Sequence, residues 1–211
     1  MKFDNISDLR KRYNVKASFY KRNNLFFRNY ADIIKSDYRN DKIDAYIIMM
    51  NPGSCEPINK DVDFTNSHSP DTAIYIDSKS DRAQKRVMQL MDNMKYNKTR
   101  ILNLFDYKEP NSRKASQIIN KSFGFPISIF STERKEELNK LTIYDSPYIV
   151  AYGLCGLDKY KKTALEFLKD KNTYGVKQKR NNLGYYYLSP PNEKRAQEII
   201  TQIVTQIKNQ L

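Results

Sequence analysis

The sequence predicts a single α/β domain in which a parallel sheet is covered by helices on both faces. Short apolar segments that end in turn residues alternate along the chain with amphipathic segments of helical period. A content of 39% hydrophobic and 12% aromatic residues indicates a folded core, and 211 residues suit one domain. Strands separated by helices imply parallel pairing between two helical layers. We therefore expect a three-layer α/β/α fold with a central, mainly parallel four-stranded sheet.

The first predicted strand comprises residues 45–50, which read AYIIMM and stop at the sequence Asn-Pro-Gly. A run that is apolar at every position is typical of a strand buried on both faces. Residues 81–94 then carry apolar side chains at helical spacing and most of their basic ones on another face, which predicts an amphipathic helix.

The remaining elements follow in the same alternation. Residues 100–105, 147–152 and 184–188 are apolar runs bounded by turn residues, and each predicts a strand. Helices are expected at 132–141 with Thr132 as the cap, at 157–168, and from Asn192 to the C-terminus. The last helix has one apolar stripe, which we expect to be core: Ala196, Ile199, Ile200, Ile203, Val204, Ile207 and Leu211. Residues 1–40 form an N-terminal extension of uncertain structure, in which 17–30 fit two short strands or one helix.

Charge and residue counts narrow the classes of function. Lys and Arg total 37 against 24 Asp and Glu, so the formal charge is +13, which favours phosphate-bearing partners, with a solvated basic surface as the alternative. No apolar run suits a membrane span or a secretory leader, and Cys55 and Cys155 are too few for a disulfide framework. We expect a cytoplasmic protein without a membrane partner. His68 is the one histidine and is expected in a loop, so neither a metal nor a cofactor is predicted.

Polar or small residues follow each predicted strand, and in parallel sheets ligands bind beyond the carboxyl ends of the strands. We predict that these strand ends meet in one substrate site, with Asn51 as the catalytic residue. The substrate-binding set is Pro52, Gly53, Ser54, Asn103, Asp106, Tyr152, Gly153, Ser189 and Pro190, to which a family resemblance adds Phe64. Plain structural roles are the alternatives: a strand-ending turn at Asn51, core packing for Phe64, and capping for Asn103 and Asp106.

Basic side chains in two segments are candidates for contacts with nucleic-acid phosphates. Lys85 and Arg86 lie on the predicted helix after residue 81, and Lys177, Lys179 and Arg180 lie in the loop before the last predicted strand. A solvated helix face and a solvated loop are the structural alternatives.

Residues 45–191 resemble the uncharacterised family called domain of unknown function 1643. Its members read M-L-N-P-S, D-P-T-I-R-R, V-N-L-F and A-W-G in that order. This chain has MMNPG at 49–53, DRAQKR at 81–86, LNLF at 102–105 and AYG at 151–153. The departures are Gly53 for a small hydroxyl residue, Tyr152 for Trp, and the loss of Pro and Thr after Asp81. Against this pattern, residues 54–80 are long, which suggests an inserted loop.

The sequence at 50–53 is also similar to the G-I-N-P-G motif of the mismatch-specific uracil- and thymine-DNA glycosylases. The resemblance implies a uracil-DNA-glycosylase-like fold, with Asn51 positioning the attacking water and Phe64 stacking on an extruded base. Ser189 and Pro190 match loosely the later loop that presses the DNA strand. The histidine of the classical uracil enzymes is missing there, and no strong general base is evident beside Asn51.

The resulting hypothesis is a nucleic-acid- or nucleotide-binding protein, in its catalytic form a DNA N-glycosylase acting on an unusual or modified base. An asparagine, a stacking aromatic and a basic rim suit an extruded nucleotide. The alternative is a non-catalytic module that uses the same basic pocket to bind a free base or nucleotide. A third hypothesis is that the basic face binds and blocks an acidic protein partner.

Overall fold

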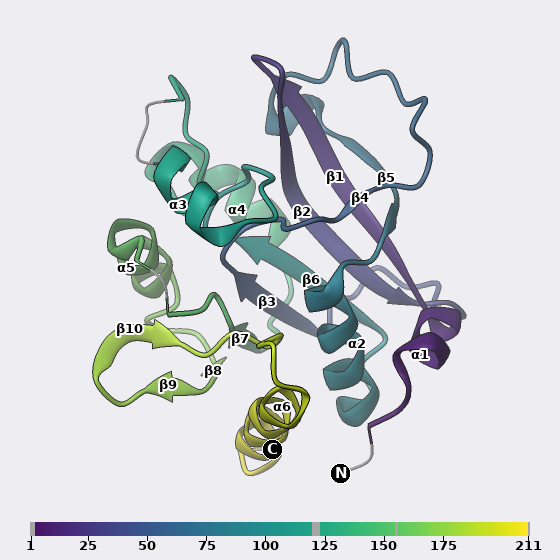
Figure 1. Ribbon diagram of the computed structural model, residues 1–211, viewed down its shortest axis with the longest axis vertical. Helices are drawn as coiled ribbons and strands as arrows, with labels where there is room; N and C mark the ends of the chain where they lie inside the picture. The colour runs from purple at the N-terminus through teal and green to yellow at the C-terminus, as the bar shows by residue number, and fades with distance from the viewer. Residues whose placement is uncertain (1–2, 120–122, 155, 211) are drawn as a thin grey trace.

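A computed structural model describes residues 3–119, 123–154 and 156–210. Its centre is an eight-stranded mixed sheet with the order β4-β5-β1-β2-β6-β3-β7-β8 (Figure 1). Helices lie on both sides of this sheet, so the chain has the α/β class and the layered arrangement that the alternating sequence pattern predicts. The strand number and pairing differ from the prediction.

The parallel half of the sheet contains β6 (Lys98–Asn103), β3 (Ala45–Met49), β7 (Tyr148–Val150) and β8 (Thr173–Tyr174). Strand β3 lies between β6 and β7, with Ile47 opposite Ile101 on one side and Ile149 on the other. Every residue of β3 is buried. The uninterrupted apolar run therefore reflects a strand that is covered on both faces.

The antiparallel half begins with a long hairpin, β1 (Tyr13–Arg22) and β2 (Leu25–Lys35). Residues 17–30, which fit either two short strands or one helix in the sequence, therefore form parts of two strands. Strand β2 also pairs with β6 and joins the two halves, while β5 (Ile74–Lys79) and β4 (Glu56–Pro57) extend the outer edge. The predicted loop at 54–80 therefore contributes two strands to the sheet.

The turn of this hairpin explains why it forms. Asn23 and Asn24 have φ values of 50° and 60°, so both adopt the left-handed conformation of a two-residue hairpin turn. Asparagine tolerates this conformation better than other residues that carry a Cβ atom, because its short amide bonds locally to the backbone. The paired asparagines are therefore the local signal for a hairpin.

Replacing Asn24 with valine is expected to destabilise the hairpin. A β-branched residue at positive φ costs roughly 1–2 kcal/mol, so the free energy of unfolding should fall by about that amount. Urea unfolding followed by circular dichroism measures the difference, and Asn24→Gly serves as the control because glycine accepts the same φ. Equal losses for the two variants would contradict this account of the turn.

Two corrections concern the predicted sheet. The sheet has eight strands of mixed direction and is not a mainly parallel four-stranded one. The predicted last strand, 184–188, overlaps β10 (Asn181–Tyr185), which pairs with β9 (Lys177–Gln178) in a separate two-stranded sheet. The short strand β8 pairs with β7 instead and is the fourth parallel strand. It has too few residues to produce a recognisable pattern in the sequence.

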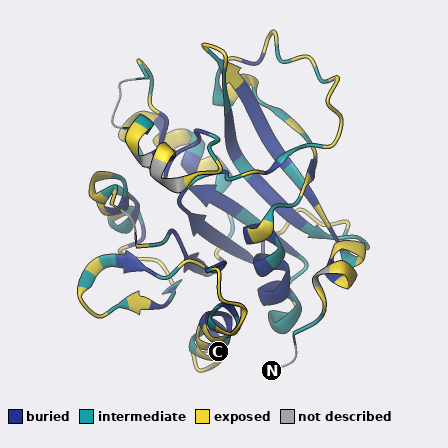
Figure 2. Ribbon diagram, viewed as in Figure 1, coloured by how far each residue is buried: buried dark blue, intermediate teal, exposed yellow. Residues whose placement is uncertain are grey.

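Helices close both faces of the large sheet, and buried residues line its two sides (Figure 2). One core lies under α1 (Ile6–Arg12), α2 (Arg82–Met94) and α6 (Glu193–Lys208). The other lies under α3 (Ser112–Ile119), α4 (Lys135–Leu141) and α5 (Asp158–Phe167), with the short η2 (Thr132–Arg134) leading into α4 and η1 (Pro70–Thr72) preceding β5.

The last helix confirms its sequence prediction closely. The Asn192 side chain accepts a hydrogen bond from the backbone N–H of Arg195, as an N-cap does. The predicted stripe is buried from Ala196 to Ile207. Leu211, which the prediction included, lies outside the described residues. Within the described ranges no helix combines the length and the apolar character needed to cross a membrane.

Candidate functional site

A cavity of about 270 Å³ lies at the carboxyl ends of β3 and β7, beside the N-terminus of α2. Strand β2 and the turn after β6 complete its walls. The lining residues are Arg28, Met49, Met50, Asn51, Gly53, Asp81, Ala83, Gln84, Pro110, Tyr152, Gly153, Leu154 and Tyr187. Four of the predicted site residues line it together, although a hundred residues separate the first from the last: Asn51, Gly53, Tyr152 and Gly153.

Asn51 is held at the cavity by hydrogen bonds on both its side chain and its backbone. Its Nδ2 donates to the carbonyl oxygen of Glu109 at 2.6 Å, which fixes the plane of the carboxamide. The backbone carbonyl of Asn51 can accept from the buried Asn103 amide at 3.1 Å. With the amide nitrogen engaged, Oδ1 is the side-chain atom of Asn51 that can accept a hydrogen bond from a ligand or a water.

Asn103 is fully buried at the end of β6 and does not line the cavity. In the carboxamide orientation that reaches Asn51, its oxygen accepts from Nη2 of Arg28 at 3.2 Å. Asn103, at the end of β6, therefore links Arg28 of β2 to Asn51, which follows β3. The sequence prediction placed Asn103 on the ligand, whereas the geometry makes it a residue that positions two others.

Arg28 is the most unusual residue of the cavity. Its side chain is 1% exposed, yet Nε and Nη1 find no hydrogen-bond partner among the residues that the structure describes. Among the described residues, no carboxylate forms a salt bridge with Arg28. Three other largely buried arginines each have a carboxylate partner: Arg86, Arg100 and Arg134. Buried polar groups are almost always hydrogen-bonded, and an unpaired buried donor costs about 1–3 kcal/mol. Such a residue at a cavity wall points to a ligand that supplies the acceptors.

The N-terminus of α2 supplies an acidic and an amide group to the same cavity. Asp81 caps the helix: its Oδ1 accepts from the Gln84 backbone N–H at 2.8 Å, and Gln84 Oε1 accepts from the Asp81 backbone N–H at 2.8 Å. The Nε2 of Gln84 has no partner within the described part of the chain. Oδ2 of Asp81 lies 2.8 Å from where a Cβ atom on Gly53 would stand, and Gly53 has φ +63°. Glycine at this position thus leaves the carboxylate in place.

Two tyrosines and two methionines form the apolar walls. The Tyr152 hydroxyl donates to the Leu183 carbonyl at 2.8 Å, and its ring meets that of Tyr185 edge-on at 5.6 Å. Tyr187 lies at the rim and is 38% exposed. Burial raises the pKa of Tyr152, so its hydroxyl stays protonated at neutral pH. Flat apolar walls with polar groups at the edges suit a planar heterocycle.

Asp106 forms a buried ion pair with Arg134. It is fully buried and does not line the cavity. Its Oδ2 accepts from Arg134 Nη1 at 2.6 Å and from the Tyr20 hydroxyl at 3.0 Å. Desolvation raises the pKa of the Asp106 carboxyl, and the Arg134 guanidinium opposes that rise. The predicted ligand contact of Asp106 is thus corrected to a structural role, because its partner, Arg134, is distant in sequence.

The remaining strand-end residues lie close to the cavity without lining it. Pro52 is buried in the turn, and Ser54 is exposed beyond it. Ser189 is buried, and its hydroxyl has no partner among the described residues. Arg82, the first residue of α2, donates to the carbonyls of Pro190 and Pro191 at 3.2 and 3.0 Å. The Ser-Pro loop is therefore attached to the helix end that forms one wall of the cavity.

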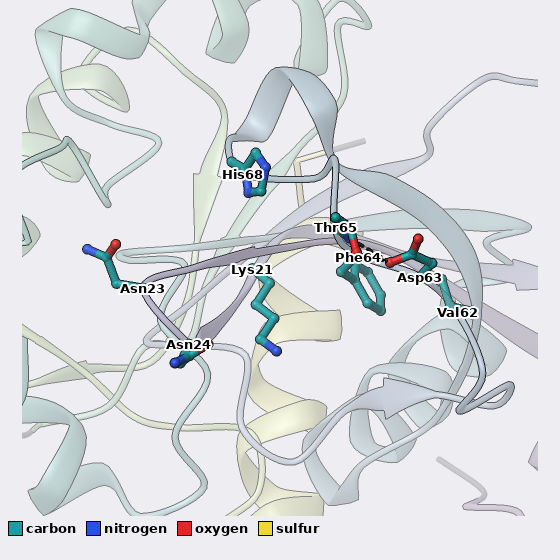
Figure 3. Close-up of a pocket in the computed structure, with 8 residues that line it drawn as sticks. All are labelled: Lys21, Asn23, Asn24, Val62, Asp63, Phe64, Thr65 and His68. Atoms are coloured by element: carbon teal, nitrogen blue, oxygen red, sulfur yellow. Dashed lines mark hydrogen bonds between the residues drawn. The ribbon is translucent and has the colours of Figure 1, made fainter.

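Phe64 lies in a different pocket, at the tip of the β1–β2 hairpin. Figure 3 shows it beside Lys21, Asn24 and His68, in a pocket of about 520 Å³. Its ring meets that of Phe26 edge-on at 5.0 Å and packs against the core. The prediction that Phe64 stacks on a base held beside Asn51 is therefore corrected, and core packing under a loop describes it better. His68 is exposed in that loop, as predicted.

The predicted phosphate contacts divide into two groups. Arg86 is 1% exposed and forms a two-pronged ion pair with Glu193 of α6, so it is a structural link between helices and is unavailable to a phosphate. Lys85 is half-buried, and the pKa of its amine is lowered by desolvation and by Arg10. In contrast, three basic residues are exposed on the β9–β10 hairpin: Lys177, Lys179 and Arg180.

Four cavity residues have roles that the sequence analysis did not assign: Arg28, Asp81, Gln84 and Tyr187. Asp81 and Gln84 were visible as a helix-start pattern and as part of the DRAQKR match, which is the signal that could have found them. The sequence around Arg28 gave no sign of a role in binding, because the sequence of a strand does not show whether an arginine in it pairs with a carboxylate or faces a cavity. Cys55 is buried and unpaired, and Cys155 lies outside the described residues.

Comparison with known proteins finds no similar protein. No family model matches the chain, and neither a curated protein nor a solved structure is significantly similar to it. Within the described residues, no group of three or more His, Cys, Asp or Glu side chains is arranged to hold a metal ion. The chemistry of the cavity is therefore argued from its own residues.

Proposed function

We propose that the cavity beside Asn51 binds the base of a nucleotide or of a nucleic acid. The observation that carries this proposal is Arg28, a buried guanidinium at a cavity wall whose Nε and Nη1 have no partner within the described part of the chain. Its donors require carbonyl, ring-nitrogen or anionic acceptors, and the heterocyclic bases present such acceptors on their edges.

The other walls support the same ligand class. Gln84 Nε2 supplies a further donor, while Asp81 Oδ2 and Asn51 Oδ1 supply acceptors. A base carries donors and acceptors on one planar edge and has two apolar faces, which suit the Tyr152 and Tyr187 side of the cavity. The volume of about 270 Å³ is below that of most drug-sized sites, which suits a base with little more than its sugar.

We further propose that the bound nucleotide is hydrolysed at its N-glycosidic bond. Asn51 Oδ1 orients a water, and the Asp81 carboxylate accepts its proton as the water oxygen bonds to C1′ of the sugar. The bond between C1′ and the base nitrogen breaks, and its electron pair leaves with the base. Arg28 stabilises the negative charge that develops on the base, and the proton held by Asp81 then passes to the departing base.

Release of a base tests the proposal directly. Single-stranded and duplex oligonucleotides that contain uracil, hypoxanthine or a modified base are incubated with the protein, and abasic sites are detected by alkaline cleavage. We expect one of these bases to be released. Binding of bases and nucleosides is measured in parallel by calorimetry. Binding without release on every substrate would support the non-catalytic binder, and neither binding nor release would refute the proposed ligand class.

Replacing Asp81 with asparagine separates binding from catalysis. The variant keeps an oxygen that can cap α2 but removes the proton acceptor, so base release should fall about 100- to 10,000-fold while base affinity changes little. The measurement is single-turnover release beside calorimetric titration. Asp158→Asn, in the first turn of α5, is the matched control and should leave both unchanged. Wild-type rates for Asp81→Asn would exclude Asp81 as the base.

A further inference from the structure

A second hollow, which we call the hairpin groove, lies between the β9–β10 hairpin and α6. It has a volume of about 470 Å³, and its lining, among the residues that the structure describes, includes no Asp or Glu. In Figure 1 the hairpin lies beside α6, close to the end of β7. The polar and aromatic lining residues are Lys177, Gln178, Lys179, Arg180, Tyr186, Arg195 and Gln202.

The cations of the hairpin groove are available to a ligand. Within the described ranges, none of the three hairpin cations forms a salt bridge, and all three are exposed: Lys177, Lys179 and Arg180. The guanidinium of Arg195 lies over the Tyr186 ring, 4.8 Å from its centroid, and has one exposed ion pair with Glu198 at 3.1 Å. Concentrated positive charge next to an aromatic ring, with one exposed ion pair at its edge, is the pattern of a surface that binds a nucleic-acid strand.

One backbone segment, which contains Tyr186 and Tyr187, borders both the hairpin groove and the cavity. Tyr187 lines the cavity beside Asn51, whereas its neighbour Tyr186 lines the hairpin groove. The Tyr186 backbone N–H donates to the Val176 carbonyl at 2.8 Å, which anchors this segment to the hairpin. Because adjacent residues of one segment line the two hollows, the hollows lie next to each other. A strand that places one base in the cavity would therefore have its neighbouring phosphates within reach of the hairpin.

We propose that the hairpin groove binds the sugar–phosphate backbone of a nucleic-acid strand whose base occupies the cavity. This inference rests on the proposed function and specifies its substrate as a polynucleotide instead of a free nucleotide. Lys177, Lys179 and Arg180 pair with successive phosphates. The stacked guanidinium of Arg195 offers a flat face to an adjacent base.

The test is the salt dependence of oligonucleotide binding by a triple variant, Lys177→Gln, Lys179→Gln and Arg180→Gln. Each phosphate contact to a single strand contributes about 0.7 to the slope of log K against log salt, so the slope should decrease by about 2. Fluorescence anisotropy with a labelled single strand that contains the preferred base measures it. Affinity at low salt should fall at least tenfold, while affinity for the free nucleoside stays unchanged.

A second triple variant with the same loss of charge is the control. Lys159, Lys162 and Lys169 are exposed on or just after α5 and line neither the hairpin groove nor the cavity beside Asn51, so their replacement by Gln should leave the slope near the wild-type value. An equal decrease in both triple variants would overturn the proposal, since net charge alone would explain it. Wild-type protein that binds the nucleoside but no oligonucleotide would also overturn it while leaving the proposed function intact. Absence of nucleoside binding would instead count against the cavity.

Discussion

Replacing Arg28 with methionine is expected to weaken base binding at least 100-fold and, at the same time, to make the protein more stable. Binding weakens because the ligand loses a charged donor, and a factor of 100 corresponds to about 2.8 kcal/mol. Stability rises because the unliganded protein buries a guanidinium with two unsatisfied nitrogens. Removing an unpaired buried polar group recovers about 1–3 kcal/mol, and methionine fills a similar part of the space.

Calorimetric titration with the preferred nucleoside and urea unfolding of the free protein measure the two effects. Arg28→Lys keeps the charge but loses the planar fork of donors, so we expect it to bind with intermediate affinity. Arg100→Met is the matched control: Arg100 is also largely buried, but it pairs with Asp32 through two contacts of 2.8 Å. Its loss should lower the free energy of unfolding by about 3–5 kcal/mol. An Arg28→Met protein that is less stable and still binds would disprove the role assigned to Arg28.

Replacing Arg134 with methionine is expected to be among the most destabilising single changes in this chain. The Arg134 guanidinium contacts Asp106, Glu137 and Asn29, and Asp106 is fully buried. Without Arg134, the Asp106 carboxylate stays buried without a counter-ion. Breaking such a pair costs about 3–5 kcal/mol. For a chain of this size, that loss lowers Tm by roughly 6–20 °C.

Thermal unfolding followed by circular dichroism measures the change in Tm. Arg195→Met removes an arginine of α6 that pairs with Glu198 at the surface, where exposed pairs contribute about 0.3–0.5 kcal/mol. That control should shift Tm by no more than about 2 °C. Similar shifts in the two variants would show that the Arg134 pair contributes little. The double variant Asp106→Leu, Arg134→Met should recover part of the loss, since it leaves no buried charge unpaired.

Four helices, α2, α4, α5 and α6, and the central strand β3 were predictable because their signals are local, whereas α1 and α3 were not predicted. The apolar run of β3 and the apolar stripe of α6 both reflect which side chains are buried, and burial imposes a period on the sequence. The hairpin of β1 and β2 was less clear. Its strands are exposed in some places and buried in others, and a bulge between Ser18 and Phe19 breaks the alternation. The two-residue β8 was too short to produce any pattern.

The candidate site was predictable only as a location. Parallel strands that alternate with helices place their carboxyl ends together, so Asn51 and Tyr152 could be expected to meet. The residues that make this cavity chemically distinctive were not predictable in the same way. Arg28 and Arg100 are both strand arginines in the sequence, yet one lacks a carboxylate partner and the other is paired twice.

The sequence by itself determined the α/β class, the buried central strand, the helix α2, the capped helix α6, and the strand end at which a cavity lies. The tertiary structure alone decided the eight-stranded mixed sheet, the pairing of Arg86 with Glu193, and the burial of Arg28 with Nε and Nη1 lacking a partner among the described residues. The physical reason is the range of the interactions. Secondary structure depends on side chains a few residues apart, whereas the partner of a buried charge depends on strand register and on crossovers that join distant segments.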